Sequence, residues 1–193
     1  MTKSNTWRTV DIEVTAAIAI VFAVVFVAWN VAWNTMTPAF AAFPPAQNIF
    51  YGIWFIPAVL AALIVQKPGA ALFAEIVAAS FSTILGSQWG LDTLLSGAIQ
   101  GGLAEIVFGA FFYSRFDART AALAAVAAAI GAWIHDVVIY WADLPLTDQL
   151  AIGVFMIISA VLLGGLAAWW IYQVLRERGV LSMFPSGRQQ TRV

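Results

Sequence analysis

Hydrophobic positions in this chain form six long runs instead of an alternating or one-sided pattern. The runs cover residues 10–34, 49–66, 70–87, 91–115, 118–142 and 147–175. Each has roughly the 20 residues that an α-helix needs to cross a hydrocarbon layer of about 30 Å. Their unbroken Ala, Val, Ile and Leu do not give the alternation of a membrane β-strand. The pattern predicts an all-α integral membrane protein with a bundle of six transmembrane helices.

The polar stretches between the runs are short, so we expect one transmembrane domain over residues 1–180 and a polar, basic cytoplasmic tail over residues 181–193. The longest connection, residues 35–45, contains Pro44 and Pro45 in succession. Consecutive prolines favour extended backbone, and we expect this loop to lie extended over the outer mouth of the bundle. A composition of 62% hydrophobic and 10% charged residues agrees with a membrane protein.

Basic residues occur on only one side of the membrane that these helices would define. They are Lys3, Arg8, Lys67, Arg115, Arg119, Arg176, Arg178, Arg188 and Arg192. All lie in the N-terminal segment, the second and fourth loops, or the C-terminal segment. Because cytoplasmic loops collect Lys and Arg, we predict a multi-pass protein of the plasma membrane with both termini in the cytoplasm.

This orientation places many polar and aromatic side chains in the outer half of the helices. The candidate substrate-binding residues are Trp29, Asn30, Trp33, Asn34, Tyr51, Trp54, Gln88, Trp89, Gln100, Glu105, His135, Asp136 and Tyr140. An aromatic belt at the lipid headgroups would explain the Trp and Tyr residues. It would not explain the amides, the imidazole or the carboxylates, which gain nothing from facing lipid. The set therefore predicts a pocket that opens to the external side.

The residue types narrow the ligand of such a pocket. Aromatic rings attract cations and stack on flat heterocycles, while amides offer paired donor and acceptor edges. No Lys or Arg is expected there, which disfavours an anionic ligand. The sequence predicts a small, flat, neutral or cationic aromatic solute. Glu105 is the candidate for the pocket floor, because Gly101 and Gly102 thin the helix above it, whereas Glu75 is expected to be structural more often than functional.

Catalytic motifs are missing from the sequence. It has one His and no Cys, which makes a zinc site very improbable, and it contains no Gly-x-Ser-x-Gly motif and no phosphate-binding loop. We therefore expect no cofactor, no metal and no enzyme activity. If ATP drives transport, separate partner ATPases must hydrolyse it.

Four alanines of the first run, Ala19, Ala23, Ala28 and Ala32, form two pairs at a spacing of four residues. Residues four apart share one face of a helix, and small side chains let helices approach closely in lipid. The pairs are explained either by packing within the bundle or by docking of another membrane protein.

Four segments together resemble YkoE-type proteins, the substrate-binding S components of energy-coupling factor (ECF) vitamin transporters. They are residues 51–57 (YGIWFIP), 66–72 (QKPGAAL, followed by Ala74 and Glu75), 85–90 (LGSQWG) and 97–105 (GAIQGGLAE). The resemblance implies an ECF S-component-like six-helix bundle that binds thiamine or its precursor hydroxymethylpyrimidine from outside. It also implies a transmembrane coupling protein and two cytoplasmic ATPases as partners, with the alanines of the first helix in the docking surface. The chain departs from relatives at Ser82, where they often carry an acid, which affects the choice of substrate within this class.

Two other functions agree with the same residues. A self-contained proton-coupled transporter of small solutes could use the three intramembrane acids as a relay, although no internal repeat is visible. A non-catalytic membrane scaffold subunit could use the outer polar layer to bind a protein.

Overall fold

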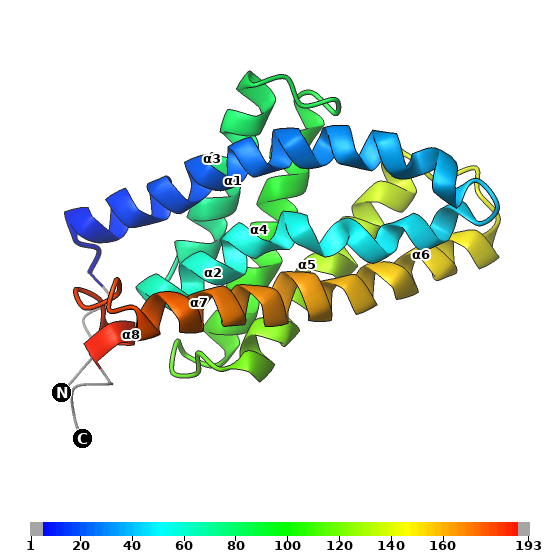
Figure 1. Ribbon diagram of the computed structural model, residues 1–193. Coiled ribbons are helices and arrows are strands. Elements are labelled where there is room, and N and C mark those ends of the chain that lie inside the picture. The colour runs from blue at the N-terminus through cyan, green and yellow to red at the C-terminus, as the bar shows by residue number, and fades with distance from the viewer. Residues whose placement is uncertain (1–5, 189–193) are drawn as a thin grey trace.

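The computed structural model describes residues 6–188, and over this range the chain is helical without strands (Figure 1). The elements are α1 (Thr9–Met36), η1 (Thr37–Phe40), η2 (Pro44–Phe55), α2 (Ile56–Val65), α3 (Ala70–Ile84), α4 (Asp92–Ala110), α5 (Ala118–Ile139), α6 (Leu146–Ser159), η3 (Ala160–Leu166), α7 (Ala167–Glu177) and α8 (Pro185–Arg188).

Five continuous helical stretches are long and apolar enough to cross a membrane. They are Thr9–Phe40, Pro44–Val65, Asp92–Ala110, Ala118–Ile139 and Leu146–Glu177. The predicted all-α membrane architecture is therefore confirmed. The remaining predicted run, residues 70–87, corresponds to α3, which is apolar but has only 15 residues, or about 22 Å at 1.5 Å per residue.

The expectation of an extended loop at residues 35–45 is wrong, because α1 runs to Met36 and the 3-10 helix η1 covers Thr37–Phe40. Pro44 and Pro45 open the 3-10 helix η2, which runs directly into α2. Proline is tolerated in a first helical turn because its missing N–H would have no partner there and its φ is already helical. The two prolines thus begin the helical stretch η2–α2 and are not part of an extended loop between it and α1.

Close approach between η2 and the continuous helical stretch formed by α6, η3 and α7 depends on small residues. The Gly52 N–H donates to Ser159 Oγ at 2.7 Å, and a Cβ on Gly52 would lie 2.3 Å from the Ser159 carbonyl oxygen. Immediately after Ser159 this stretch adopts the π-helical turn η3, which joins α6 to α7. A glycine at position 52 is therefore required for these two helical stretches to pack.

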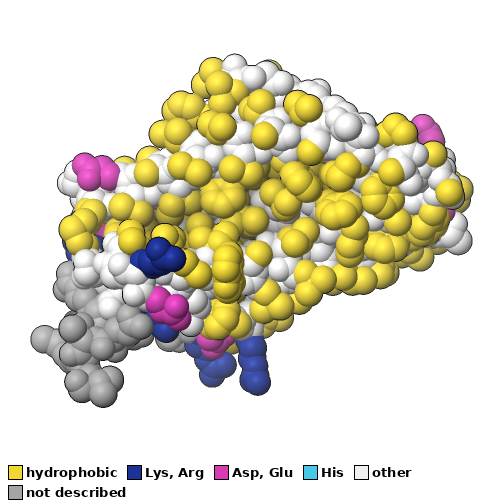
Figure 2. Space-filling view, in the orientation of Figure 1, with side chains coloured by type: hydrophobic (Ala, Val, Ile, Leu, Met, Phe, Trp, Pro, Cys, Tyr) yellow, Lys and Arg dark blue, Asp and Glu magenta, His cyan; other side chains and the backbone are white. Residues whose placement is uncertain are grey.

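The centre of the molecule is α2, all ten residues of which are buried. In Figure 1 it lies between α1 and α7, and it also contacts α3, α4 and α5. The outer faces of these helices carry exposed apolar side chains, seen as yellow areas in Figure 2. A fully apolar helix inside a bundle with an apolar surface is the arrangement expected of a protein surrounded by lipid.

The two ends of the described chain lie close together (Figure 1), and Lys and Arg side chains gather towards this end in Figure 2. Here the buried carboxylate of Asp11 pairs with Lys67 and with Arg8. Within the predicted tail, Phe184 is buried, and Ser186 Oγ donates to the carbonyl oxygen of Ile64 at 2.8 Å. The first part of the tail thus packs on the end of α2, while Lys3 and Arg192 lie outside the described residues.

Candidate functional site

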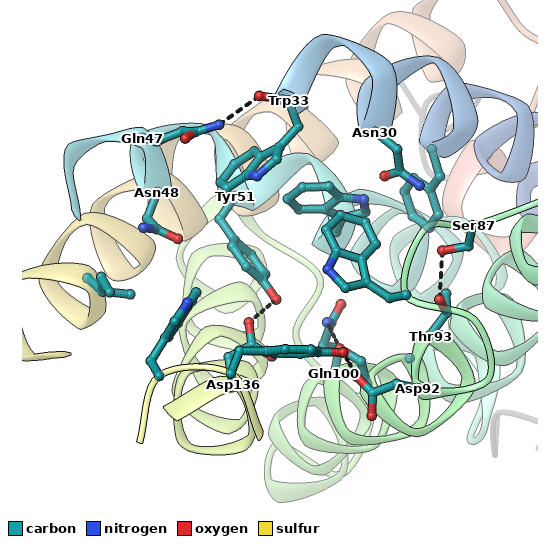
Figure 3. Close-up of a pocket in the computed structure, with 18 of the residues that line it drawn as sticks. Asn30, Trp33, Gln47, Asn48, Tyr51, Ser87, Asp92, Thr93, Gln100 and Asp136 are labelled. Carbon is teal, nitrogen blue, oxygen red and sulfur yellow. Dashed lines mark hydrogen bonds between the residues drawn. The ribbon is translucent and has the colours of Figure 1, made fainter. Parts of the chain in front are cut away.

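A cavity of about 430 Å³ lies between the parts of α1, η2, α5 and α6 that are far from the termini, with α3 and α4 completing its wall (Figures 1 and 3). Eight of the predicted substrate-binding residues line it: Asn30, Trp33, Tyr51, Trp54, Trp89, Gln100, Asp136 and Tyr140. They come from five segments of the chain: α1, η2, the α3–α4 connection, α4 and the end of α5. The tertiary structure therefore brings these eight residues into one site.

Aromatic side chains form one wall of the cavity around Trp54. The ring of Trp54 lies 4.9 Å from Tyr51, 5.0 Å from Trp33 and 5.5 Å from Trp89, measured between ring centroids. The contacts are tilted or edge-to-face, with interplanar angles of 59° to 86°. Edge-to-face packing of this kind fixes ring orientation. The wall therefore presents preformed aromatic faces and edges to a ligand.

A carboxylate lies beside this wall. The hydroxyl of Tyr51 donates to Asp136 Oδ2 at 2.6 Å, as Figure 3 shows, and the second oxygen of Asp136 lies 2.8 Å from Nδ1 of His135. The other ring nitrogen of His135 lies 3.1 Å from Oδ1 of Asp92. The second oxygen of Asp92, Oδ2, accepts from the Tyr140 hydroxyl. Burial and the Asp92 carboxylate raise the pKa of Tyr140, just beyond the end of α5, so that its phenol remains a donor.

Three polar side chains in the cavity wall are buried and have a polar atom without a partner. These atoms are Asn30 Oδ1, Asn48 Oδ1 and Ser82 Oγ. Leaving a buried acceptor unpaired costs about 1–3 kcal/mol. Such a cost is tolerated where a ligand supplies the missing hydrogen bond, so these atoms indicate where a polar ligand is held.

The charge of the cavity has one sign. Glu75, Asp92, Asp136 and Asp148 line it, and no Lys or Arg does so among residues 6–188. Glu75 is only 1% exposed and accepts a hydrogen bond from the Ala58 N–H at 3.2 Å. A buried site with several carboxylates and no basic side chain favours a positively charged ligand.

Glu105 does not form the floor of the cavity, and that prediction is wrong. Its carboxylate accepts from the N–H groups of Gly69 and Ala71 at 2.7 and 2.8 Å, and from the Tyr113 hydroxyl at 2.7 Å. It thereby satisfies the free N–H groups at the start of α3, where negative charge is also favoured by the helix dipole. The floor contains Glu75 instead, because α4 packs against α3 so closely that a Cβ on Gly101 would lie 2.7 Å from the Glu75 Cβ.

Four further predicted residues lie beside the cavity and do not line it. Trp29 packs edge-on against Phe50. The side-chain amide of Asn34 on α1 donates a hydrogen bond to the amide oxygen of Gln88 in the α3–α4 connection. His135 does not line the cavity but contacts three residues that do: the carboxylates of Asp136 and Asp92 and the ring of Tyr140.

The four alanines of α1 do not form one docking stripe. Ala19 and Ala23 are 0% exposed and face the interior, where α1 packs on α3, whereas Ala28 is exposed. Positions 19 and 28 are nine residues apart, which at about 100° per residue places them on opposite helix faces. The inner pair therefore serves packing within the chain, and a partner cannot contact it.

Sequence reasoning left several cavity residues out of the candidate set, notably Glu75, Ser82 and Asp92. A signal was present on α3, where Glu75, Ala79 and Ser82 follow the i, i+4, i+7 spacing of one helix face. This small or polar face is the one that α3 turns to the cavity.

Comparison with known proteins gives one consistent result. Residues 10–131 match a family described as the permease component of an ABC-type cobalt transport system. The chain is 34% identical over 185 residues to YkoE of Bacillus subtilis (strain 168), whose name gives it as a candidate HMP/thiamine permease protein; the match covers 95% of this chain and 92% of the relative. The crystal structure of an S component of an ECF transporter superposes with a TM-score of 0.90 and 33% identity, over 96% of this chain and 93% of the other.

Proposed function

Because this chain belongs to the YkoE family of ECF-transporter S components, we propose that it is the substrate-binding subunit of an ECF-type importer. Its ligand is thiamine or hydroxymethylpyrimidine, taken up from the external side. As a multi-pass protein of the plasma membrane with the fold of a transport subunit, it binds the solute and is not itself an enzyme.

The observation that carries this proposal is the aromatic and acidic cavity. A volume of about 430 Å³ is within the range of small-molecule sites. Thiamine has a cationic thiazolium ring and an aminopyrimidine ring. The first suits the Trp33–Trp54–Trp89 wall and the carboxylates. The second suits amide groups, which accept and donate in one plane, and carboxylates, which accept. The absence of Lys and Arg from the described lining argues against phosphorylated forms.

Direct calorimetry of the detergent-purified chain tests this function. We expect saturable one-to-one binding of thiamine or hydroxymethylpyrimidine and much weaker binding of thiamine phosphate, because the phosphate would meet only carboxylates. A chain that binds none of these compounds is not a vitamin-binding subunit, and the scaffold interpretation would then be favoured.

We propose that α3 completes a set of six membrane segments and that both termini lie in the cytoplasm. The distribution of basic residues and the location of the cavity far from the termini support this orientation. Cysteine substitutions at the exposed positions Ala41 and Ser182 test it. A membrane-impermeant reagent should label Ala41→Cys in intact cells and should label Ser182→Cys only after permeabilisation. The reverse result would invert the orientation and place the cavity mouth on the inner side.

The proposal includes a transmembrane coupling protein and two cytoplasmic ATPases as partners. The sequence contains no phosphate-binding loop and no internal repeat. We expect the chain alone in liposomes to bind but not accumulate ligand, and uptake to require the partners and ATP. Accumulation driven by a proton gradient without partners would favour the self-contained transporter.

A further inference from the structure

One uninterrupted series of side-chain hydrogen bonds connects the cavity with the protein surface. It runs in the order Tyr51, Asp136, His135, Asp92 and Tyr140. Both carboxylates line the cavity, whereas His135 does not. At the far end Tyr140 is 44% exposed. Tyr51 at one end lines the cavity, and Tyr140 at the other end both lines the cavity and is exposed.

The hydrogen-bond geometry around His135 indicates how many hydrogens the imidazole and its two carboxylate partners share. Both ring nitrogens of His135 lie within hydrogen-bond distance of a carboxylate oxygen, at 2.8 and 3.1 Å. A neutral imidazole has only one N–H, so two such bonds require a second hydrogen. The remaining oxygens of Asp136 and Asp92 already accept from the hydroxyls of Tyr51 and Tyr140. The second hydrogen therefore lies between His135 and these two carboxylates, and it is assigned to the imidazole, which is the more basic group.

No other positive group faces this unit among the described cavity residues. The titratable groups around it are the phenols of Tyr51 and Tyr140, which are neutral donors, and the carboxyls of Glu75 and Asp148 elsewhere in the wall. Two carboxylates and one imidazolium leave one net negative charge. A ligand with one positive charge would balance that charge, but it would also repel the imidazolium in a site shielded from water.

We propose that Asp92, His135 and Asp136 act as one charge unit, and that a cationic ligand expels the second proton of His135 when it binds. The N–H bond of the imidazolium breaks, its electron pair stays on the nitrogen, and the proton leaves to solvent at the Tyr140 end. His135 is then a positioning residue that sets the charge of the site without touching the ligand. The inference rests on the proposed function and adds to it that charge, not only shape, selects the substrate and that affinity depends on pH.

Calorimetry in two buffers with different ionisation enthalpies, near neutral pH, counts the protons exchanged per bound ligand. We expect thiamine to release up to one proton and neutral hydroxymethylpyrimidine to release none. Oxythiamine keeps the thiazolium cation without the amino group of the pyrimidine ring, so proton exchange by that group is excluded with this ligand. Oxythiamine should release the same number of protons per bound ligand as thiamine. Correspondingly, the Kd of thiamine should fall as pH rises, by up to tenfold per pH unit where one proton is released.

Two variants test the assignment of the proton. His135→Gln removes the titrating ring, and Asp92→Asn replaces the second carboxylate by an amide that can itself donate to a neutral imidazole. Both should bind thiamine without proton release. Because release is counted per mole of bound ligand, a variant with weakened affinity still reports it, and either variant suffices if the other does not fold.

The outcomes separate this inference from the function on which it rests. Binding of thiamine without proton exchange, or release that persists in His135→Gln, overturns the charge unit and leaves the vitamin-binding role intact. Failure of the unaltered chain to bind any of the three ligands overturns both.

Discussion

The two ends of this molecule each bury a carboxylate on a long helix, but they neutralise it differently. Near the termini, Asp11 is 0% exposed and is paired with Arg8 and Lys67 of the same chain. At the opposite end, Asp136 is 5% exposed and has only hydroxyl and imidazole neighbours. The first end is complete by itself, whereas the second retains negative charge and unpaired polar atoms. The difference indicates that the end near the termini is structural and that the opposite end is the candidate binding site.

Removing the ion pairs of Asp11 near the termini should have the largest effect on stability. Asp11→Asn removes the carboxylate that compensates Lys67, which is itself buried at 7% exposure. An uncompensated buried charge costs about 3–5 kcal/mol, so we expect a loss of about 3 kcal/mol in the free energy of unfolding, measured by SDS titration.

Asp143→Asn at an exposed position is the matched control and should change stability by less than about 0.5 kcal/mol. Ligand affinity of Asp11→Asn should remain that of the unaltered protein, because the cavity lies at the other end. Equal stability of the two variants would contradict the structural role of Asp11.

Substitution in the candidate binding site should change ligand affinity. Asp136→Asn removes charge from a desolvated partner, and we expect thiamine to bind about 2 kcal/mol more weakly in calorimetry. Neutral hydroxymethylpyrimidine should lose clearly less affinity than thiamine. An equal loss for both ligands would mean that Asp136 contributes a hydrogen bond and shape, not charge.

The buried alanines of α1 lie between the two ends of the molecule. Their substitution tests which face of α1 packs against the rest of the chain. Ala23→Leu adds three carbons at a position that is 0% exposed, and overpacking of this kind costs about 1–3 kcal/mol. Ala28→Leu on the opposite, exposed face is the control and should leave the unfolding free energy nearly unchanged. If Ala28→Leu is the more destabilising of the two, the face assigned to α1 is wrong.

The smallest effect is expected from the aromatic wall. Trp33→Ala should weaken binding of a cationic ligand by about 0.5–2 kcal/mol, the range of a cation–π contact. Trp170→Ala removes a tryptophan that is 63% exposed on α7 and should not change affinity. Equal effects of the two substitutions would show that Trp33 belongs to an interfacial belt.

The helices and the broad chemistry of the site could be predicted because both depend on residue type along the chain. Runs of apolar residues gave helix ranges that agree with the structure to within a few residues, apart from the 3-10 start at Pro44. Asn30, Trp33, Gln100 and Asp136 were found because polar groups are costly at membrane depth wherever they do not face a cavity.

The wrong predictions share a different cause: the sequence does not show which face of a helix points towards the cavity or towards another helix. Glu75 and Glu105 are both acids on apolar helices, and only the packing of α3 on α4 decides that Glu75 reaches the cavity while Glu105 caps α3. Likewise, Ala19 and Ala28 are identical residues, and only the position of α3 makes one buried and the other exposed.

The sequence by itself determined that this chain is a helical membrane protein with a layer of aromatic and acidic residues, because hydrophobicity and charge act on each residue locally. The tertiary structure decided which of those polar residues share a cavity, because that depends on helix rotation and on contacts between segments far apart in the chain. It also decided that His135 bridges two carboxylates from different helices. No pattern within one helix contains that contact, since Asp92 and His135 meet only when α4 packs on α5.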